Sequence, residues 1–189
     1  MKPRLGYALC GSFCTHEKSI RALEELASKY DILPIVSYTV KETDTRFGKA
    51  SDLLEKLECI SGKKVIDSIP LAEPIGPKGM TDILVIAPCT GNTLAKLAQG
   101  ITDTPVTMAA KSHLRCKKPL VIALATNDAM SANLKNLATL LEKKNVYFVP
   151  LVQDDIINKP DSLVCDFERL EETVSLAARG IQIRPLFRI

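Results

Sequence analysis

Residues 82–100 hold the densest group of side chains in this chain that could bind a ligand. An apolar run at 83–87 ends at Pro88, which has no N–H, so we expect strand pairing to stop there. A helical pattern resumes near Leu94, and one residue is enough to cap the N-terminus of that helix. Four small or polar residues in a row are more than capping requires. The segment offers hydroxyl groups, an amide, and a glycine that lets a planar ligand lie against the backbone. We therefore predict a binding site directly after a buried strand. The residues of this group are Cys89, Thr90, Gly91, Asn92 and Thr93.

Two other apolar runs are followed by residues of similar chemistry. Gly11 comes after the first run and lets the backbone turn tightly, while Ser12 and Thr15 could cap the next helix. The free N–H groups of such a helix favour an anion such as phosphate. Ser37 comes near the end of the second run. A GxGxxG or Walker pattern is absent, which disfavours a dinucleotide or a nucleoside triphosphate.

The hydropathy pattern alternates strands with amphipathic helices along the chain. Nearly continuous apolar strands separated by helices imply a parallel sheet covered on both faces. We therefore predict an α/β fold of three layers, α/β/α, with a mainly parallel, doubly wound, flavodoxin- or Rossmann-like sheet. The expected strands are 4–10, 32–38, 65–69, 83–87, 120–125 and 146–149, and the expected helices are 20–30, 53–60, 93–100, 105–114, 134–141 and 167–178.

The whole chain, 1–189, is predicted to form a single domain, with 180–189 as a C-terminal tail whose packing partner the sequence leaves open. The proline-rich segment 70–77 is interpreted as a loop. In doubly wound sheets, ligands bind beyond the carboxyl ends of the strands, where the strand order reverses. The three polar strand ends are therefore expected to converge on one cleft.

Composition excludes several classes of function. A net charge of +3, with both signs spread along the chain, argues against nucleic acid as a partner. No apolar run is long enough for a bilayer span, and no signal peptide is recognised, so a cytoplasmic location without membrane contact is expected. Six cysteines form no CxxC, and two histidines complete no zinc spacing. We therefore interpret the cysteines as reduced thiols and expect no metal.

The segment APCTGNTLAKLAQGITDTPVT resembles the flavoprotein family of flavin-containing cysteine decarboxylases and flavin prenyltransferases. The N-terminal GYALCGSFCT resembles the first strand and phosphate loop of that family, and Ser37 its second strand end. The resemblance covers roughly residues 4–149. The matching positions in the first segment are Pro88, Asn92, Thr93, Ala95, Lys96, Ala98, Gly100 and Asp103.

The resemblance implies an FMN site. Gly11, Ser12, Phe13 and Ser37 would hold the phosphate side, whereas residues 89–93 would border the flavin ring or the substrate. In the strand-end segment ATNDAM, the positions that would contact flavin or substrate are Thr126, Asn127 and Met130.

Three segments resemble one branch of this family more specifically: GSFCTHEKSI, TDTRFGKASD and KPDSLVCDFERLEET. That branch implies a subunit of a sporulation enzyme in the mother-cell cytoplasm. Such a subunit would act together with a partner subunit that carries NAD(P). The pair would oxidise a dihydrodipicolinate-type dicarboxylate to the aromatic dicarboxylate. Relatives assemble as trimers or larger oligomers, so a homo-oligomer is expected.

Departures from the family keep other functions open. The loop before the 83–87 strand contains no histidine, and the C-terminal segment lacks the cysteine- and glycine-rich flap of the decarboxylases. The arginine of the prenyltransferases is also absent near 125–128, so no catalytic residue is assigned. The alternatives are a stand-alone FMN-dependent decarboxylase of a cysteine-derived acid and a scaffold subunit without catalysis.

Three single residues are weighed separately. Cys89 is interpreted as a buried thiol rather than a redox group, and His16 as a solvated residue of a first helical turn. Arg46 could bind a carboxylate in a fork, although a loop residue without a ligand is the favoured interpretation.

Overall fold

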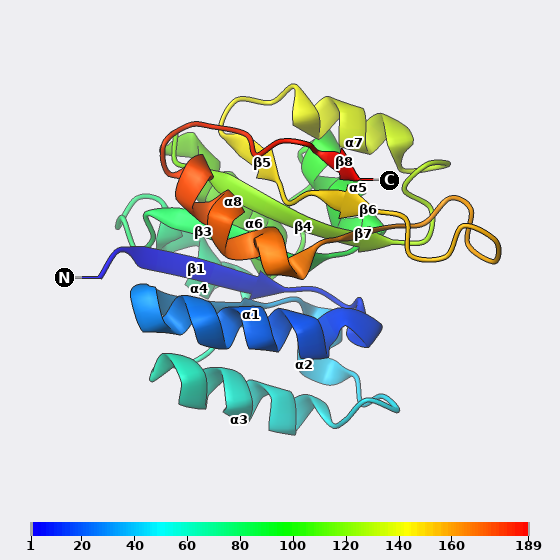
Figure 1. The fold of residues 1–189 in the computed structure, drawn as a ribbon. Helices are drawn as coiled ribbons and strands as arrows, with labels where there is room; N and C mark the ends of the chain where they lie inside the picture. Colours follow the sequence, from blue (N-terminus) through cyan, green and yellow to red (C-terminus); the bar gives the residue numbers. More distant parts are fainter. Residues whose placement is uncertain (1, 189) are drawn as a thin grey trace.

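The structure is a computed structural model that describes residues 2–188. Within that range, eight strands form one sheet in the order β2-β1-β3-β4-β7-β6-β8, and β5 pairs beside β4 (Figure 1). Strands β1 to β5 pair in parallel, whereas β7 runs antiparallel to β4 and β6. The strands are β1 (Arg4–Leu9), β2 (Asp31–Val36), β3 (Ile83–Cys89), β4 (Leu120–Thr126), β5 (Val146–Phe148), β6 (Leu151–Val152), β7 (Leu163–Cys165) and β8 (Phe187–Arg188).

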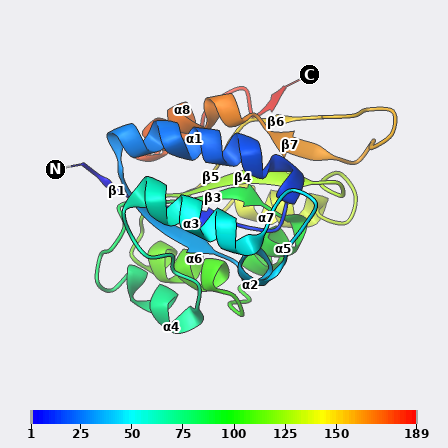
Figure 2. The same cartoon turned by 90° about the horizontal axis from the view of Figure 1, so that it is seen from below.

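Helices cover both faces of the sheet, which confirms the predicted three-layer, mainly parallel α/β fold (Figure 2). One face carries α1 (His16–Lys29) and α8 (Leu170–Ala177). The other face carries α5 (Gly91–Gln99) and α6 (Pro105–Arg115), and α3 (Ala50–Ser61) packs beside β2. The remaining helices are α2 (Tyr38–Glu42), α4 (Ile69–Ala72) against α6, and α7 (Leu134–Leu141) against α5. None of these helices is long and apolar enough to cross a bilayer.

The strand order reverses between β1 and β3, which are direct neighbours. The chain leaves β1 toward β2 on one side and returns to β3 on the other, so the loops after β1 and β3 diverge and open a crevice. The backbone N–H of Cys10 donates to the Pro88 carbonyl at 3.1 Å and holds these two strand ends together. The Ser37 N–H donates to the Leu9 carbonyl at 3.0 Å and adds the end of β2.

The centre of the sheet is fully buried, and its polar groups are bonded internally. Every residue of β3 is buried, as its uninterrupted apolar sequence predicts. The Tyr7 hydroxyl lies 2.9 Å from both the carbonyl oxygen and the hydroxyl of Ser19, and the Ser19 hydroxyl donates to the Ala87 carbonyl at 2.6 Å. This network joins α1 to β1 and β3 directly beneath the crevice.

The predicted elements around β2 and the proline-rich segment were partly wrong. Residues 65–69 form no strand, and only Ile66 bridges to Ile35. The 70–77 loop contains α4 and the 3-10 helix η2 (Glu73–Ile75). Pro70 and Pro74 lie in the first turns of these helices, where proline has no N–H to lose and its fixed φ is favourable.

Pro88 does not end its strand, contrary to expectation. β3 continues to Cys89, which pairs with Leu124 across an irregular register. Proline lacks only the donor, and the Pro88 carbonyl still accepts the bond from Cys10.

The tail packs on its own chain: Ile183 and Leu186 are buried, and β8 adds to β6. Gln182 forms two hydrogen bonds of 2.8 Å with the backbone of Phe148 and fixes the start of this segment.

Candidate functional site

Two adjoining cavities lie beyond the carboxyl ends of β1 to β4. The first, which we call the hydroxyl cavity, measures about 450 Å³ and is lined by residues that include Ser37, Thr39 and Asn92. The second, the Phe13 cavity, measures about 590 Å³. Both linings include Gly11 and Thr90, so the cavities meet there. Each lies in the range of roughly 300–1,000 Å³ that small ligands occupy.

The structure brings nine of the twelve predicted site residues to these cavities, and three lie elsewhere. Contact between these residues and a flavin stays a prediction. The exceptions are Cys89, Gly91 and Met130. The nine lining residues are Gly11, Ser12, Phe13, Ser37, Thr90, Asn92, Thr93, Thr126 and Asn127.

Cys89 and Gly91 lie beneath the cavities. The Cys89 side chain is fully buried, and burial raises the pKa of its thiol well above the usual value, so the group stays protonated. A Cβ on Gly91 would lie 2.6 Å from Thr126 Oγ1 and from Asn133 Nδ2, and 2.8 Å from Asp128 Oδ1. Gly91 therefore serves close packing of α5 under the turn that follows β4.

That turn depends on Asp128, which sequence reasoning missed. Asp128 Oδ1 accepts a hydrogen bond from Thr126 Oγ1 at 2.6 Å, and Oδ2 accepts one from Asn133 Nδ2 at 2.8 Å. The Asn133 amide N–H also donates to the Asp128 carbonyl at 3.0 Å. These bonds fix the turn that presents Asn127. The available sequence signal is the Asn127-Asp128 pair directly after a buried strand, because both residue types favour turns.

Thr90 and Thr93 use their hydroxyls inside the protein. Thr90 Oγ1 accepts from the Thr93 N–H at 3.2 Å and is the N-cap, so α5 begins at Gly91, earlier than predicted. The Thr90 hydroxyl donates to Thr93 Oγ1 at 3.1 Å, and that hydroxyl donates to Cys10 Sγ at 3.3 Å. Burial raises the pKa of Cys10 to about 11. This chain of hydrogen bonds shapes the cavity wall and leaves few groups for a ligand.

Other side chains of the lining keep free hydrogen-bonding capacity. Ser37 Oγ accepts from the Val40 N–H at 3.3 Å and retains its own proton for donation. The side chains of Ser12, Asn92 and Asn127 form no hydrogen bond with other described residues. Each cavity offers one free hydroxyl and one free amide, Ser37 with Asn92 in the hydroxyl cavity and Ser12 with Asn127 in the Phe13 cavity. Hydroxyl and amide groups of this kind suit a ligand that carries both a phosphate group and a polar heterocycle. The donor set therefore fits FMN.

Two predictions about the loop after β1 were wrong. Neither Ser12 nor Thr15 caps a helix with its side chain; instead Thr15 Oγ1 donates to the Ser12 carbonyl at 2.8 Å. His16 is buried rather than solvated, because its Nε2 donates to the Cys10 carbonyl at 2.8 Å and its ring packs on Phe13. Burial lowers the pKa of His16, so the imidazole is neutral near pH 7 and orders this loop.

Arg46 contributes to neither cavity. Its guanidinium carbon lies 4.8 Å from the ring centroid of Phe47, which does line the Phe13 cavity. Carboxylate binding by Arg46, the less favoured interpretation of the sequence, stays untested.

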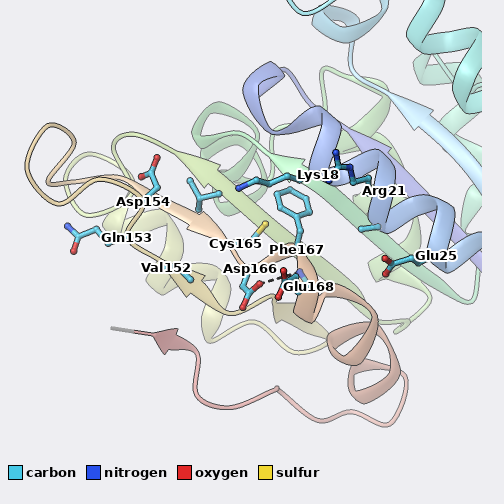
Figure 3. A pocket seen from close by; sticks show the side chains of 12 residues that line it. Lys18, Arg21, Glu25, Val152, Gln153, Asp154, Cys165, Asp166, Phe167 and Glu168 are labelled. Carbon is cyan, nitrogen blue, oxygen red and sulfur yellow. Dashed lines mark hydrogen bonds between the residues drawn. The ribbon is translucent and has the colours of Figure 1, made fainter.

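A third cavity of about 710 Å³ opens between α1 and strands β6 and β7 (Figure 3). The 3-10 helix η3 (Phe167–Arg169) also contributes to its wall. Lys18, Asp154 and Val164 belong to both this cavity and the Phe13 cavity, so the two are continuous. None of the residues of the third cavity was among the predicted site residues. The reason is that β6 and β7, which form part of its wall, span only two or three residues and show no hydropathy period.

Comparison with known proteins agrees with this geometry. Residues 1–181 match the sequence model of the Flavoprotein family. The B subunit of dipicolinate synthase from Bacillus subtilis (strain 168) is 43% identical over 184 residues, which is 97% of this chain and 92% of that protein. The crystal structure of the corresponding dipicolinate synthase B subunit from Bacillus halodurans superposes with a TM-score of 0.91 at 41% identity, covering 100% of this chain and 99% of that one.

A more distant structure shares the fold alone. DmrB of Burkholderia xenovorans, solved in complex with FMN, has a TM-score of 0.68 at 20% identity and covers 92% and 94% of the two chains. The resemblance read from the sequence is confirmed, both for the family and for similarity to the dipicolinate synthase B subunit. This chain belongs to the flavoprotein family.

Proposed function

We propose that this chain is an FMN-binding B subunit of dipicolinate synthase, which works with an A subunit to oxidise dihydrodipicolinate to dipicolinate during sporulation. Identity of 43% over 97% of the chain to a protein of that name supports the assignment. The observation that carries it is the convergence of the loops after β1, β2, β3 and β4 on two joined cavities with free hydroxyl and amide groups.

FMN would lie across the junction of the two cavities at Gly11 and Thr90, and the part of the Phe13 cavity near Lys18 and Lys159 would stay open to the substrate. Ser12 and Ser37, with the backbone at Gly11, would bind the phosphate, since hydroxyls and free N–H groups suit an anion. Phe13 would line the phosphate side, and Asn92 and Asn127 would bind the heteroatoms of the flavin ring. DmrB, a protein of the same fold, was solved in complex with FMN, which supports FMN as the ligand. Bound flavin would supply an acceptor or relay for the hydride, with NAD(P) on the A subunit as the electron acceptor.

The chain's own residues would bind, orient and shield the reactants. The turn held by Asp128 would fix Asn127, and the hydrogen bonds from Thr90 to Cys10 would keep the wall rigid. Oxidation of the dihydro ring releases a hydride and a proton. The neutral His16 is held by Cys10 and faces neither of the two main cavities, so no proton acceptor is assigned to this chain.

Reconstitution tests the proposal. The purified chain, FMN and the A subunit, supplied with dihydrodipicolinate and oxidised nicotinamide cofactor, should form dipicolinate, measured by its ultraviolet absorption. The Asn92→Leu variant should lower the rate at least tenfold and weaken FMN binding, because a cavity-lining amide is replaced by an apolar side chain. Gln99→Leu, at an exposed amide on the same helix α5 and outside both cavity linings, is the control. Full activity of the A subunit alone would refute a catalytic role for this chain.

A further inference from the structure

Two lysines flank the Phe13 cavity, and their charges suit a dianion. We propose that Lys18 and Lys159 bind the carboxylates of a pyridine dicarboxylate and determine specificity for the doubly charged ring. This inference rests on the proposed function, which supplies the substrate class, while the residues are identified from the structure. It gives this chain a direct part in substrate recognition.

Lys18 is the stronger of the two candidates. It lies near the start of α1, its side chain is exposed, and it forms no ion pair among residues 2–188. It lines both the Phe13 cavity and the third cavity, at the place where they join. Figure 3 shows its amine extending from α1 toward the side on which Asp154 lies. A cation with no protein partner in the described part of the chain, at the junction of two cavities, is available to an incoming carboxylate.

Lys159 approaches the same cavity from the loop between β6 and β7. Its N–H donates to the Asp155 carbonyl at 2.9 Å, and Gln153 Nε2 donates to the Pro160 carbonyl at 2.5 Å, which closes the loop on itself. The Met130 N–H donates to the Asp161 carbonyl at 3.0 Å and ties the loop to the turn after β4. Met130 thus acts through the backbone, by placing Lys159 near the turn that carries Asn127.

The Phe13 cavity and the hydroxyl cavity differ in the net charge of their linings. The charged residues of the Phe13 cavity are Lys18, Lys159 and Asp154, which leaves one net positive charge. In the hydroxyl cavity, by contrast, Lys96 Nζ lies 2.9 Å from Asp103 Oδ2, so its charge is already matched. A dianion is therefore favoured in the Phe13 cavity, where ammonium groups attract carboxylates.

Asp154 competes with the substrate for one lysine. Its Oδ2 lies 3.4 Å from Lys159 Nζ, a long contact between side chains that are 33% and 48% exposed. Such a pair is weak and is readily replaced by a ligand carboxylate. Removing the Asp154 charge should therefore strengthen dicarboxylate binding, whereas removing either lysine should weaken it. The opposite signs distinguish an electrostatic role from general disturbance of the loop.

Calorimetric titration of the full chain, with and without saturating FMN, tests whether Lys18 and Lys159 bind the two carboxylates. The probes are pyridine-2,6-dicarboxylate and the monocarboxylate pyridine-2-carboxylate. Lys18→Met and Lys159→Met should each weaken dicarboxylate binding roughly five- to tenfold and monocarboxylate binding less, because a screened ion pair is lost. Asp154→Asn should strengthen it about threefold, and Lys18→Arg should retain it, since the charge is kept. Lys135→Met, an exposed lysine of α7 outside these cavities, is the control.

The outcomes separate the inference from the function on which it rests. Lysine-dependent dicarboxylate binding without dipicolinate formation would support the site and refute the proposed reaction. Dipicolinate formation with unchanged kcat/KM in both lysine variants would refute the site and keep the reaction. No measurable dicarboxylate binding to the chain, or equal effects of the lysine variants on both probes, would also overturn the inference. Thermal unfolding of each variant confirms that it is folded.

Discussion

Gly91→Ala tests the packing of α5 beneath the turn after β4. The new Cβ would lie 2.6 Å from two polar atoms and 2.8 Å from a third, all at distances that side chains do not adopt. The three atoms, Thr126 Oγ1, Asn133 Nδ2 and Asp128 Oδ1, belong to side chains that are hydrogen-bonded to one another, so none moves without disturbing a hydrogen bond. Losing one or two such bonds lowers the free energy of unfolding by about 1–3 kcal/mol. Part of this loss is offset by up to about 1 kcal/mol, because alanine has less conformational entropy than glycine in the unfolded chain.

A net loss of about 2 kcal/mol is therefore expected, measured by urea unfolding of the full chain. Fluorescence titration should show weaker FMN binding as well, because the displaced turn carries Asn127. In a double-mutant cycle with Asn133→Ala, which removes one clashing atom, the two losses should couple by at least about 0.5 kcal/mol. Gly100→Ala, at the other end of α5, is a control that strains a backbone at φ 73° without a nearby atom. The reasoning would be refuted if the losses of Gly91→Ala and Asn133→Ala were additive in the double mutant. It would also be refuted if Gly91→Ala left both stability and FMN affinity unchanged.

Three further predictions concern the stability of the fold. Burial lowers the pKa of His113 to about 4 from its ordinary 6.5, so the unfolded chain binds more protons than the folded chain between those pH values. The free energy of unfolding, measured in urea, should therefore fall by up to about 3 kcal/mol as the pH drops from 6.5 toward 4. A free energy that does not change with pH in this range would contradict the prediction. Tyr7→Phe should lose about 1–2 kcal/mol with FMN affinity unchanged, since the Ser19 bond lies beneath the site. Thr104→Ala removes the capping box of α6 and should lower the free energy of unfolding by about 1 kcal/mol, seen as a lower thermal midpoint; no shift would show that the box contributes nothing.

The order of the long elements was predictable because their signals are local. The short apolar runs of β3 and β4 favour buried strands. Gly62 and Gly100 end their helices in left-handed conformations with φ of 66° and 73°. Strands β6, β7 and β8 were not predicted. They span two or three residues each and exist through pairing with one another and with β4, a tertiary effect that leaves no periodic pattern.

The site was predictable at the strand ends and not beyond them. Ser37 and Asn92 follow recognisable strands, and the rule that ligands bind at carboxyl ends places both near one cleft. His16 was misread because a histidine in a first helical turn gives no sign that the Cys10 carbonyl and Phe13 will bury it. Lys18 and Lys159 are far apart in sequence, and only the folded chain brings them to one cavity.

Every functional step proposed above depends on flavin in the two joined cavities, so titration of the purified chain with FMN is the decisive measurement. Flavin fluorescence should be quenched saturably at about one FMN per chain, and the oxidised-flavin absorption bands should appear in the protein fraction after gel filtration. Asn92→Leu should abolish this retention. Flavin that stays free at high protein concentration, with fluorescence unquenched, would contradict the account and leave only the fold.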